Sequence, residues 1–170
     1  MSNIWNKEEK IMELVAKHYN IELKASNTYF HLATVAKNLG YDNVSSFFIK
    51  MGRDKQEAHM PRLIDYLMKL DHVLRIGTIS VPEIINVNSI KDVMDLAVST
   101  EAKVRESVKQ VAEVAFLARD FETFEMLQWF VKDSIEDLEE VSDLATYVNA
   151  PNVNMINIES ITKSRFLKKK

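Results

Sequence analysis

Glu22, His59 and Glu101 are the side chains of this sequence whose types and positions point most directly to metal chemistry. Each of them interrupts an apolar stripe that repeats every three or four residues, and each lies near the middle of its own segment. Two carboxylates and one imidazole offer oxygen and nitrogen ligands that suit iron, zinc or manganese. A carboxylate on such a stripe must be neutralised, paired or bound to a metal ion, because burying it alone costs several kcal/mol.

Gln56 and Ser134 interrupt the second and fourth apolar stripes, and each also lies near the middle of its own segment. Because helix midpoints share one layer in an antiparallel bundle, we expect these polar groups to converge with the three named above. The sequence leaves two interpretations of this layer open. It is either a shared metal site or a buried polar network in which Lys55 or His18 neutralises the carboxylates.

The composition limits the chemistry further. The chain has 170 residues, with no cysteine, 3 glycines and 3 prolines. The absence of cysteine excludes disulfides, thiolate zinc sites, iron–sulfur clusters and cysteine nucleophiles. The glycines lie too far apart for a phosphate-binding loop, and so few turn residues cannot build a many-stranded sandwich or barrel. Any metal must therefore bind His, Asp or Glu.

The formal net charge is −3, and basic residues are concentrated in residues 159–170, so the rest of the chain is acidic. An acidic body argues against broad binding of nucleic acid. The N-terminus lacks the layout of a signal peptide, and no segment approaches the roughly 18 apolar residues of a membrane span. We therefore expect a cytoplasmic protein without membrane or nucleic-acid partners.

Four long segments have the periodicity of amphipathic helices, and a shorter one follows them. They run over about 7–37, 43–70, 89–117, 121–147 and 155–167. Ser89 with Asp92 resembles a capping box, and Asp120 suits an N-cap. Gly40 ends the first helix. Pro61 lies inside the second helix and should kink it beside His59, one of the candidate metal ligands.

Residues 71–88 form a connection that is too long for a hairpin between neighbouring helices, and any strands within 73–88 would be peripheral. The pattern predicts an all-α fold, an antiparallel four-helix bundle with one long crossover between helices two and three and a short C-terminal fifth helix. We interpret residues 1–170 as a single domain, with the bundle over about 7–148 and the last helix over about 155–167.

Four stretches carry a resemblance to a known family, namely IELKASNTY (21–29), EAHMPRLIDYLMKL (57–70), TEAKV around Glu101, and FETFEMLQWFV (121–131). Through them the chain resembles the ferritin family, and bacterial non-haem ferritins most closely. The resemblance implies self-assembly into a homo-oligomeric cage of about 24 subunits that stores ferric mineral. It implies iron as the bound metal. Haem is not expected, because Glu57 stands where haem-binding relatives have methionine.

The resemblance matches residues of the family's ferroxidase site, where Fe(II) is oxidised at two metals, to four positions here: Glu22, Tyr29, His59 and Glu101. Two positions depart from the pattern. Gln56 replaces the glutamate that bridges both metals, and Ser134 replaces a Gln or Glu of the fourth helix. An amide offers only a neutral oxygen in place of a bridging carboxylate. We therefore expect iron storage with ferroxidase activity impaired or absent, and we expect Gln56→Glu to accelerate oxidation.

Two other functions fit the same residues. One is an active ferroxidase or di-iron oxidase with a rearranged ligand set, and the other is a non-catalytic protective shell. Acidic residues of the fourth helix offer a further iron-binding surface, on which Glu136 and Glu140 are four residues apart and could share one cation. The other interpretation of these acids is a solvated helix face.

Overall fold

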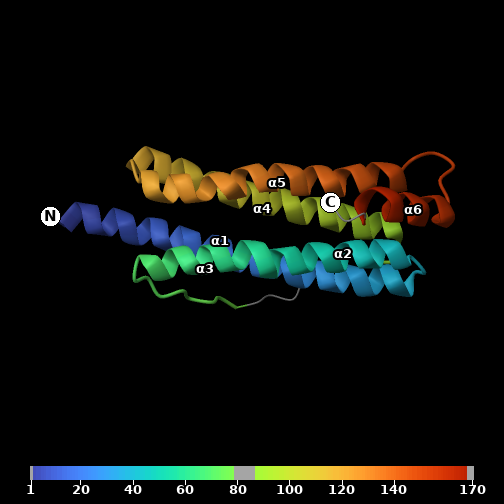
Figure 1. The fold of residues 1–170 in the computed structure, drawn as a ribbon, viewed down its shortest axis with the longest axis horizontal. Coiled ribbons are helices and arrows are strands. Elements are labelled where there is room, and N and C mark those ends of the chain that lie inside the picture. The colour runs from blue at the N-terminus through green and yellow to red at the C-terminus, as the bar shows by residue number, and fades with distance from the viewer. Residues whose placement is uncertain (1, 79–86, 168–170) are drawn as a thin grey trace.

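A computed structural model describes residues 2–78 and 87–167, with side chains from residue 9 onward. Four long helical rods form a bundle in which α1 lies beside α2 and α3, and α4 lies beside α5 (Figure 1). The helices are α1 (Ser2–Asn38), α2 (Asp42–Asp54), α3 (Met60–Lys69), α4 (Ile90–Ala118), α5 (Phe121–Val148) and α6 (Met155–Ile161). This arrangement confirms the predicted four-helix bundle with its short C-terminal helix.

The second rod of the bundle is one continuous helix with a wider turn inside it. A π-helical turn, η1 (Lys55–His59), joins α2 to α3, and a second one, η2 (Thr162–Phe166), extends α6. The long crossover leaves α3 at one end of the bundle and reaches α4 at the other (Figure 1). Its described parts, residues 72–78 and 87–88, contain no strand, while the rest of the region in which we allowed strands lies outside the described residues.

Local signals set the helix ends as the sequence predicts. The Ser89 side chain accepts a hydrogen bond from the Asp92 N–H, and the Asp92 carboxylate accepts one from the Ser89 N–H, which completes a capping box. The Asp120 carboxylate accepts from the Thr123 N–H at 3.0 Å. Gly40 adopts φ 91° after α1, a conformation that favours glycine.

The π-turn η1 changes which side chains of the second rod face the core. It lies just before Pro61, which has no N–H for the helical ladder, and the Met60 N–H bonds to the Lys55 carbonyl five residues back. Lys55 and His59 are four residues apart and are both buried, and the wider turn lets the buried stripe continue in steps of four residues at Leu63 and Leu67. Our prediction that Gln56 lies on the inward stripe is therefore wrong, because Gln56 is exposed, whereas His59 and Leu63 are buried as predicted.

Two apolar clusters fill the bundle on either side of a polar middle layer. The cluster toward α6 includes Phe47, Phe48, Met94, Val141 and Leu144. The cluster toward the other end includes Ile11, Val15, Leu63, Val108 and Leu127. Polar side chains held between two packed cores are shielded from water, which strengthens every electrostatic interaction among them. Among the described residues, no helix is long and apolar enough to cross a membrane.

Candidate metal centre

The bundle brings the two glutamates and the histidine that the sequence predicts as metal ligands into one buried layer. Glu22 comes from α1, His59 from η1 and Glu101 from α4, and each is at most 1% exposed. The His59 Nδ1 atom lies 3.0 Å from Glu22 Oε1. Glu22 and Glu101 do not meet each other directly. They contact a common neighbour, the side chain of Lys55.

Lys55 projects its ammonium group into the centre of this layer. Its Nζ atom lies 2.7 Å from Asp137 Oδ2, 3.1 Å from Glu101 Oε1 and 3.6 Å from Glu22 Oε2, and the side chain is fully buried. Burial by itself lowers the pKa of Lys55, but the charges of Glu22, Glu101 and Asp137 outweigh it and raise the pKa far above its usual value. Lys55 is therefore a fixed positive charge among three carboxylates.

The two positions at which the sequence departs from the ferritin pattern do not take part in this charge cluster. Gln56 is exposed on the outside of the π-turn. Ser134 is buried, but its hydroxyl donates to the Val131 carbonyl of its own helix at 3.0 Å. The fourth rod instead contributes Asp137, three residues after Ser134, which our sequence analysis did not single out from the other acidic residues of that helix. Its helical spacing from Ser134 was the signal that could have identified it.

Tyr29 fixes the orientation of Glu101. The Tyr29 hydroxyl donates to Glu101 Oε1 at 2.6 Å, and its ring stacks on Phe48. Burial, reinforced by the negative charge of Glu101, raises the pKa of Tyr29 well above its usual value. The phenol therefore keeps its proton and acts as a hydrogen-bond donor in the layer.

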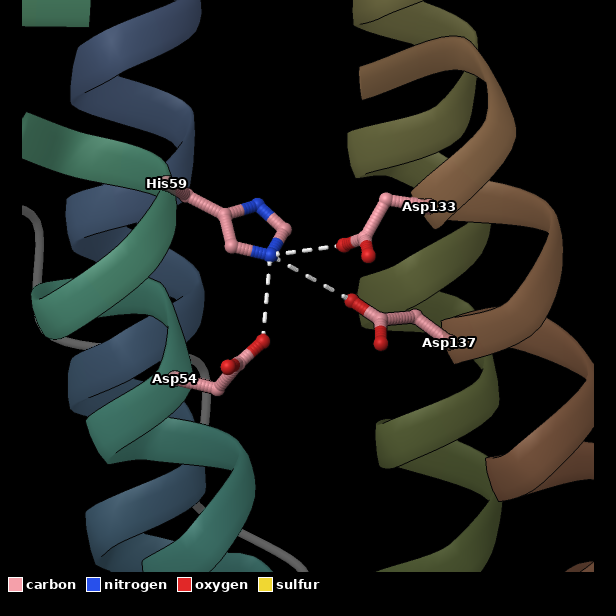
Figure 2. A group of neighbouring side chains, drawn as sticks. All are labelled: Asp54, His59, Asp133 and Asp137. Atoms are coloured by element: carbon pink, nitrogen blue, oxygen red, sulfur yellow. Dashed lines mark hydrogen bonds and ion pairs between the residues drawn. The ribbon is translucent and has the colours of Figure 1, made fainter. Parts of the chain in front are cut away.

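His59 stands between the buried layer and a groove on the bundle surface. Its Nδ1 atom faces Glu22, while its Nε2 atom lies 3.2 Å from Asp54 Oδ2, 2.9 Å from Asp133 Oδ2 and 3.7 Å from Asp137 Oδ2 (Figure 2). Burial lowers the pKa of His59, but the surrounding carboxylates outweigh this effect and raise the pKa to about 11. The ring is thus an imidazolium that carboxylates approach from both sides.

Four of these side chains could hold a metal ion at the groove. Asp54, His59, Asp133 and Asp137 each offer one ligand atom, and these four atoms all lie within 4.8 Å of one another (Figure 2). Burial, opposed by Lys55 and reinforced by Glu101, raises the pKa of Asp137 to about 7. A divalent cation there would compete with the His59 proton and would add positive charge where carboxylates repel one another.

Sequence reasoning missed Asp54 as a candidate ligand. It precedes the π-turn directly, and a regular helix does not place it on the same side as His59. The groove beside it is lined by further acids of α5, namely Asp133, Glu136, Asp137, Glu139, Glu140 and Asp143. Cations near this face therefore meet a strongly negative surface.

Glu136 and Glu140, which we named as a possible shared cation site, line this groove but are not joined to the buried layer. Glu136 is exposed, and Glu140 Oε1 accepts a hydrogen bond from Lys50 Nζ at 2.9 Å. Part of this acidic face is thus already neutralised by a basic side chain of α2.

The chain is similar to known proteins in both sequence and fold. A family model described as a ferritin-like domain matches residues 12–149. The crystal structure of M. penetrans ferritin is 65% identical, covers 91% of this chain and 94% of its own, and superimposes with a TM-score of 0.88. An open-pore ferritin from Archaeoglobus fulgidus has the same fold at 17% identity, with a TM-score of 0.86 and coverage of 95% and 98%.

A bacterial non-haem ferritin from Campylobacter jejuni is 24% identical over 129 residues, which cover 76% of each chain. The domain match spans most of the sequence, and the helices that it spans carry the polar layer and the groove. On these grounds, this chain belongs to the ferritin family.

Proposed function

We propose that this protein is a subunit of an iron-storing ferritin shell, located in the cytoplasm, whose ferroxidase activity is impaired or absent. Membership of the family and the 65% identity to a ferritin of known structure support the storage role. A single observation carries the second half of the proposal. The Lys55 ammonium group lies among the carboxylates of Glu22, Glu101 and Asp137.

The charge of Lys55 opposes a pair of iron ions in this layer. A divalent ion about 4 Å from an ammonium group is repelled by roughly 8 kcal/mol at an effective dielectric constant of about 20. The three carboxylates that would compensate two Fe(II) ions are already paired with Lys55. We therefore expect Fe(II) to avoid the two-metal arrangement and to be oxidised slowly.

The groove offers Fe(II) an alternative place to bind. Asp54, Asp133 and Asp137 face it, and the acids of α5 around them attract cations from solution. Oxygen ligands of this kind suit both Fe(II) and Fe(III). In this proposal the groove collects iron for mineral growth, while the buried layer keeps its structural ion pairs.

Rapid-mixing measurements of Fe(II) oxidation test the proposal. We expect the wild-type protein to lack a fast phase and Lys55→Glu to accelerate oxidation at least about tenfold, equivalent to ~1.4 kcal/mol of the barrier. Gln56→Glu is the matched control, because Gln56 is exposed on the same turn, and we now expect it to leave the rate unchanged. Equal rates for Lys55→Glu and wild type would show that Lys55 is not the obstacle.

The compact set of Asp54, His59, Asp133 and Asp137 favours a second function, an active ferroxidase with a rearranged ligand set. That function predicts a fast phase in the wild-type protein that is lost in Asp133→Asn. Such a result would replace the impaired-ferroxidase proposal and leave the storage role intact.

A further inference from the structure

Basic side chains from other elements pair with the acidic face of α5 along much of its length. Two of them come from η1, one from α2 and one from η2. The four ion pairs are His59 with Asp133, Lys55 with Asp137, Lys50 with Glu140, and Arg165 with Asp143. A ladder of ion pairs therefore follows α5, with roughly one pair for each helical turn.

The two halves of this ladder differ in their exposure to solvent. The side chains of Lys55 and His59 are at most 2% exposed, whereas those of Lys50 and Arg165 are each 50% exposed. Exposed ion pairs are weak and are screened by salt, while a buried charge cannot leave its partner without a large cost. Dissolved cations can therefore replace Lys50 and Arg165 but not Lys55.

Arg165 attaches the C-terminal turn η2 to α5. After α5 the chain reverses, and α6 leads back along the bundle toward η2 (Figure 1). The Arg165 guanidinium group pairs with Asp143 and also donates a hydrogen bond to the Tyr147 hydroxyl at 2.6 Å. Both partners belong to α5, so this one side chain connects the two elements.

Lys50 reinforces the attachment from the side of α2. Its Nζ atom lies 2.9 Å from Glu140 Oε1 and donates a hydrogen bond to the Phe166 carbonyl of η2 at 3.4 Å. The Phe166 ring is buried and packs edge-on against Phe47 of α2 at a centroid distance of 5.8 Å. η2 is thus fixed to α2 by a buried aromatic ring, and to α5 by charges that face solvent.

The same turn forms one wall of the acidic groove. Arg165, Phe166 and Leu167 line it together with Asp54 and the acids of α5. The groove has a volume of about 780 Å³, which leaves room for cations with their water shells. Release of η2 from α5 would widen the groove and free the carboxylates of Glu140 and Asp143.

We propose that η2 is an electrostatic latch on the groove, which Lys50 and Arg165 hold against α5 and which opens when cations compete for Glu140 and Asp143. The latch needs no discrete metal site, because raised ionic strength weakens exposed ion pairs in the same way. Each opening frees two carboxylates, so the first cations make binding of the next ones easier. The inference rests on the proposed function in one respect, namely that iron collected in the groove supplies the competing cations.

Hydrogen exchange of the assembled protein, followed by mass spectrometry, tests the latch. We expect the amides of residues 165–167 to exchange roughly tenfold faster when sodium chloride rises from about 20 mM to about 500 mM, or when terbium(III) is added. The amides of α6 should not change, because Glu159 keeps that helix on α2. Exchange at residues 165–167 that responds to neither salt nor terbium would overturn the proposal.

A double variant, Lys50→Gln with Arg165→Gln, separates the latch from general loosening. Its residues 165–167 should exchange fast at low salt, without further change when terbium is added. It should also bind terbium about tenfold more tightly than the wild type, because no internal cation has to be displaced. Lys163→Gln is the matched control, since Lys163 is exposed on the same turn and makes no ion pair with any described residue. Terbium affinity in the double variant equal to that of the control would contradict the latch.

Terbium luminescence measures binding, and anomalous scattering in crystals locates the ion, so the latch and the groove function can fail separately. Terbium bound in the wild-type groove without faster exchange at residues 165–167 would overturn the latch alone. A turn that opens with salt, in a protein whose groove retains no terbium, would support the latch and overturn the proposal that the groove collects iron.

Discussion

At the residue scale, the polar layer depends on charges that balance one another within a few ångströms. Lys55 and His59 supply positive charge to it, and Glu22, Glu101 and Asp137 supply carboxylates. Burial raises the pKa of Glu22, yet Lys55 and the two histidines outweigh it and hold that pKa well below its usual range. Because each charge is buried, removing any one of them leaves an unpaired partner in the core.

The stability of a Lys55→Met variant tests whether these buried charges compensate one another. The substitution keeps most of the side-chain volume but leaves the facing carboxylates uncompensated, so we expect it to cost about 3–5 kcal/mol. Added zinc should restore part of the loss by supplying the missing positive charge. Thermal unfolding with and without zinc measures both effects, and an unchanged melting temperature in the variant would contradict the balance described here.

The raised pKa of His59, about 11, predicts how stability depends on pH. A histidine that binds its proton more tightly in the folded protein contributes stability that is complete below its unfolded pKa of about 6.5. This contribution, of several kcal/mol, is then lost as the pH rises toward the folded value. We expect the melting temperature to fall between pH 7 and pH 10, and the fall to be clearly smaller in His59→Gln. If the melting temperature depended on pH in the same way in both proteins, the His59 proton would not contribute to stability.

At the element scale, the short C-terminal helix stabilises another helix of the same bundle. The Glu159 carboxylate of α6 accepts hydrogen bonds from the Asn43 N–H at 2.7 Å and the Val44 N–H at 3.2 Å. These donors belong to the first turn of α2, whose own N-cap residue, Tyr41, provides no side-chain hydrogen bond. Phe166 packs edge-on against Phe47 and anchors the same contact. α6 thus supplies the cap that α2 lacks.

Glu159→Ala should therefore lower the stability of the bundle by about 1 kcal/mol, the usual effect of losing an N-cap. Glu113→Ala, which removes an exposed glutamate from α4, serves as the control. Thermal unfolding of the two variants measures the difference. If both variants unfold at the same temperature, the carboxylate of Glu159 does not act as a cap.

Helix positions could be predicted from the sequence, but the inward face of the second rod could not. Periodicity and the cap at Ser89 are local signals, and they located the helices well. The π-turn depends on Pro61 and on how Leu63 and Leu67 pack, which are not local properties. The sequence predicted Gln56 at the inward position of this turn, but the structure places Lys55 there, one residue earlier. The core therefore contains a positive charge where we expected a neutral amide.

At the scale of the whole molecule, the ends and edges of the bundle expose large apolar side chains. Leu117 is 73% exposed and Phe121 is 62% exposed at the turn between α4 and α5. Further exposed apolar side chains lie in the last turn of α3, just after α3 and on α6: Met68, Leu70, Val73, Ile76, Met155 and Ile156. Apolar side chains in contiguous exposed patches mark protein contacts, and in this family such contacts would join subunits of a shell.

The mass of the purified particle tests assembly directly. We expect light scattering to find a large closed oligomer for the wild-type protein and smaller species for Leu117→Asp, because a charge at an apolar contact is costly. Leu117 packs little within its own bundle, so the helical content measured by circular dichroism should stay the same. A stable wild-type monomer or dimer would refute the shell.

The side chain of Lys55 also affects how the folded subunit behaves when metal ions are scarce. An ammonium group tethered to the backbone cannot be chelated, diluted away or changed in oxidation state. If the protein stores iron as proposed, the carboxylates of Glu22, Glu101 and Asp137 would therefore keep Lys55 as their partner before iron is loaded and after it is withdrawn. The folded subunit of the proposed shell would then not depend on bound iron for its stability.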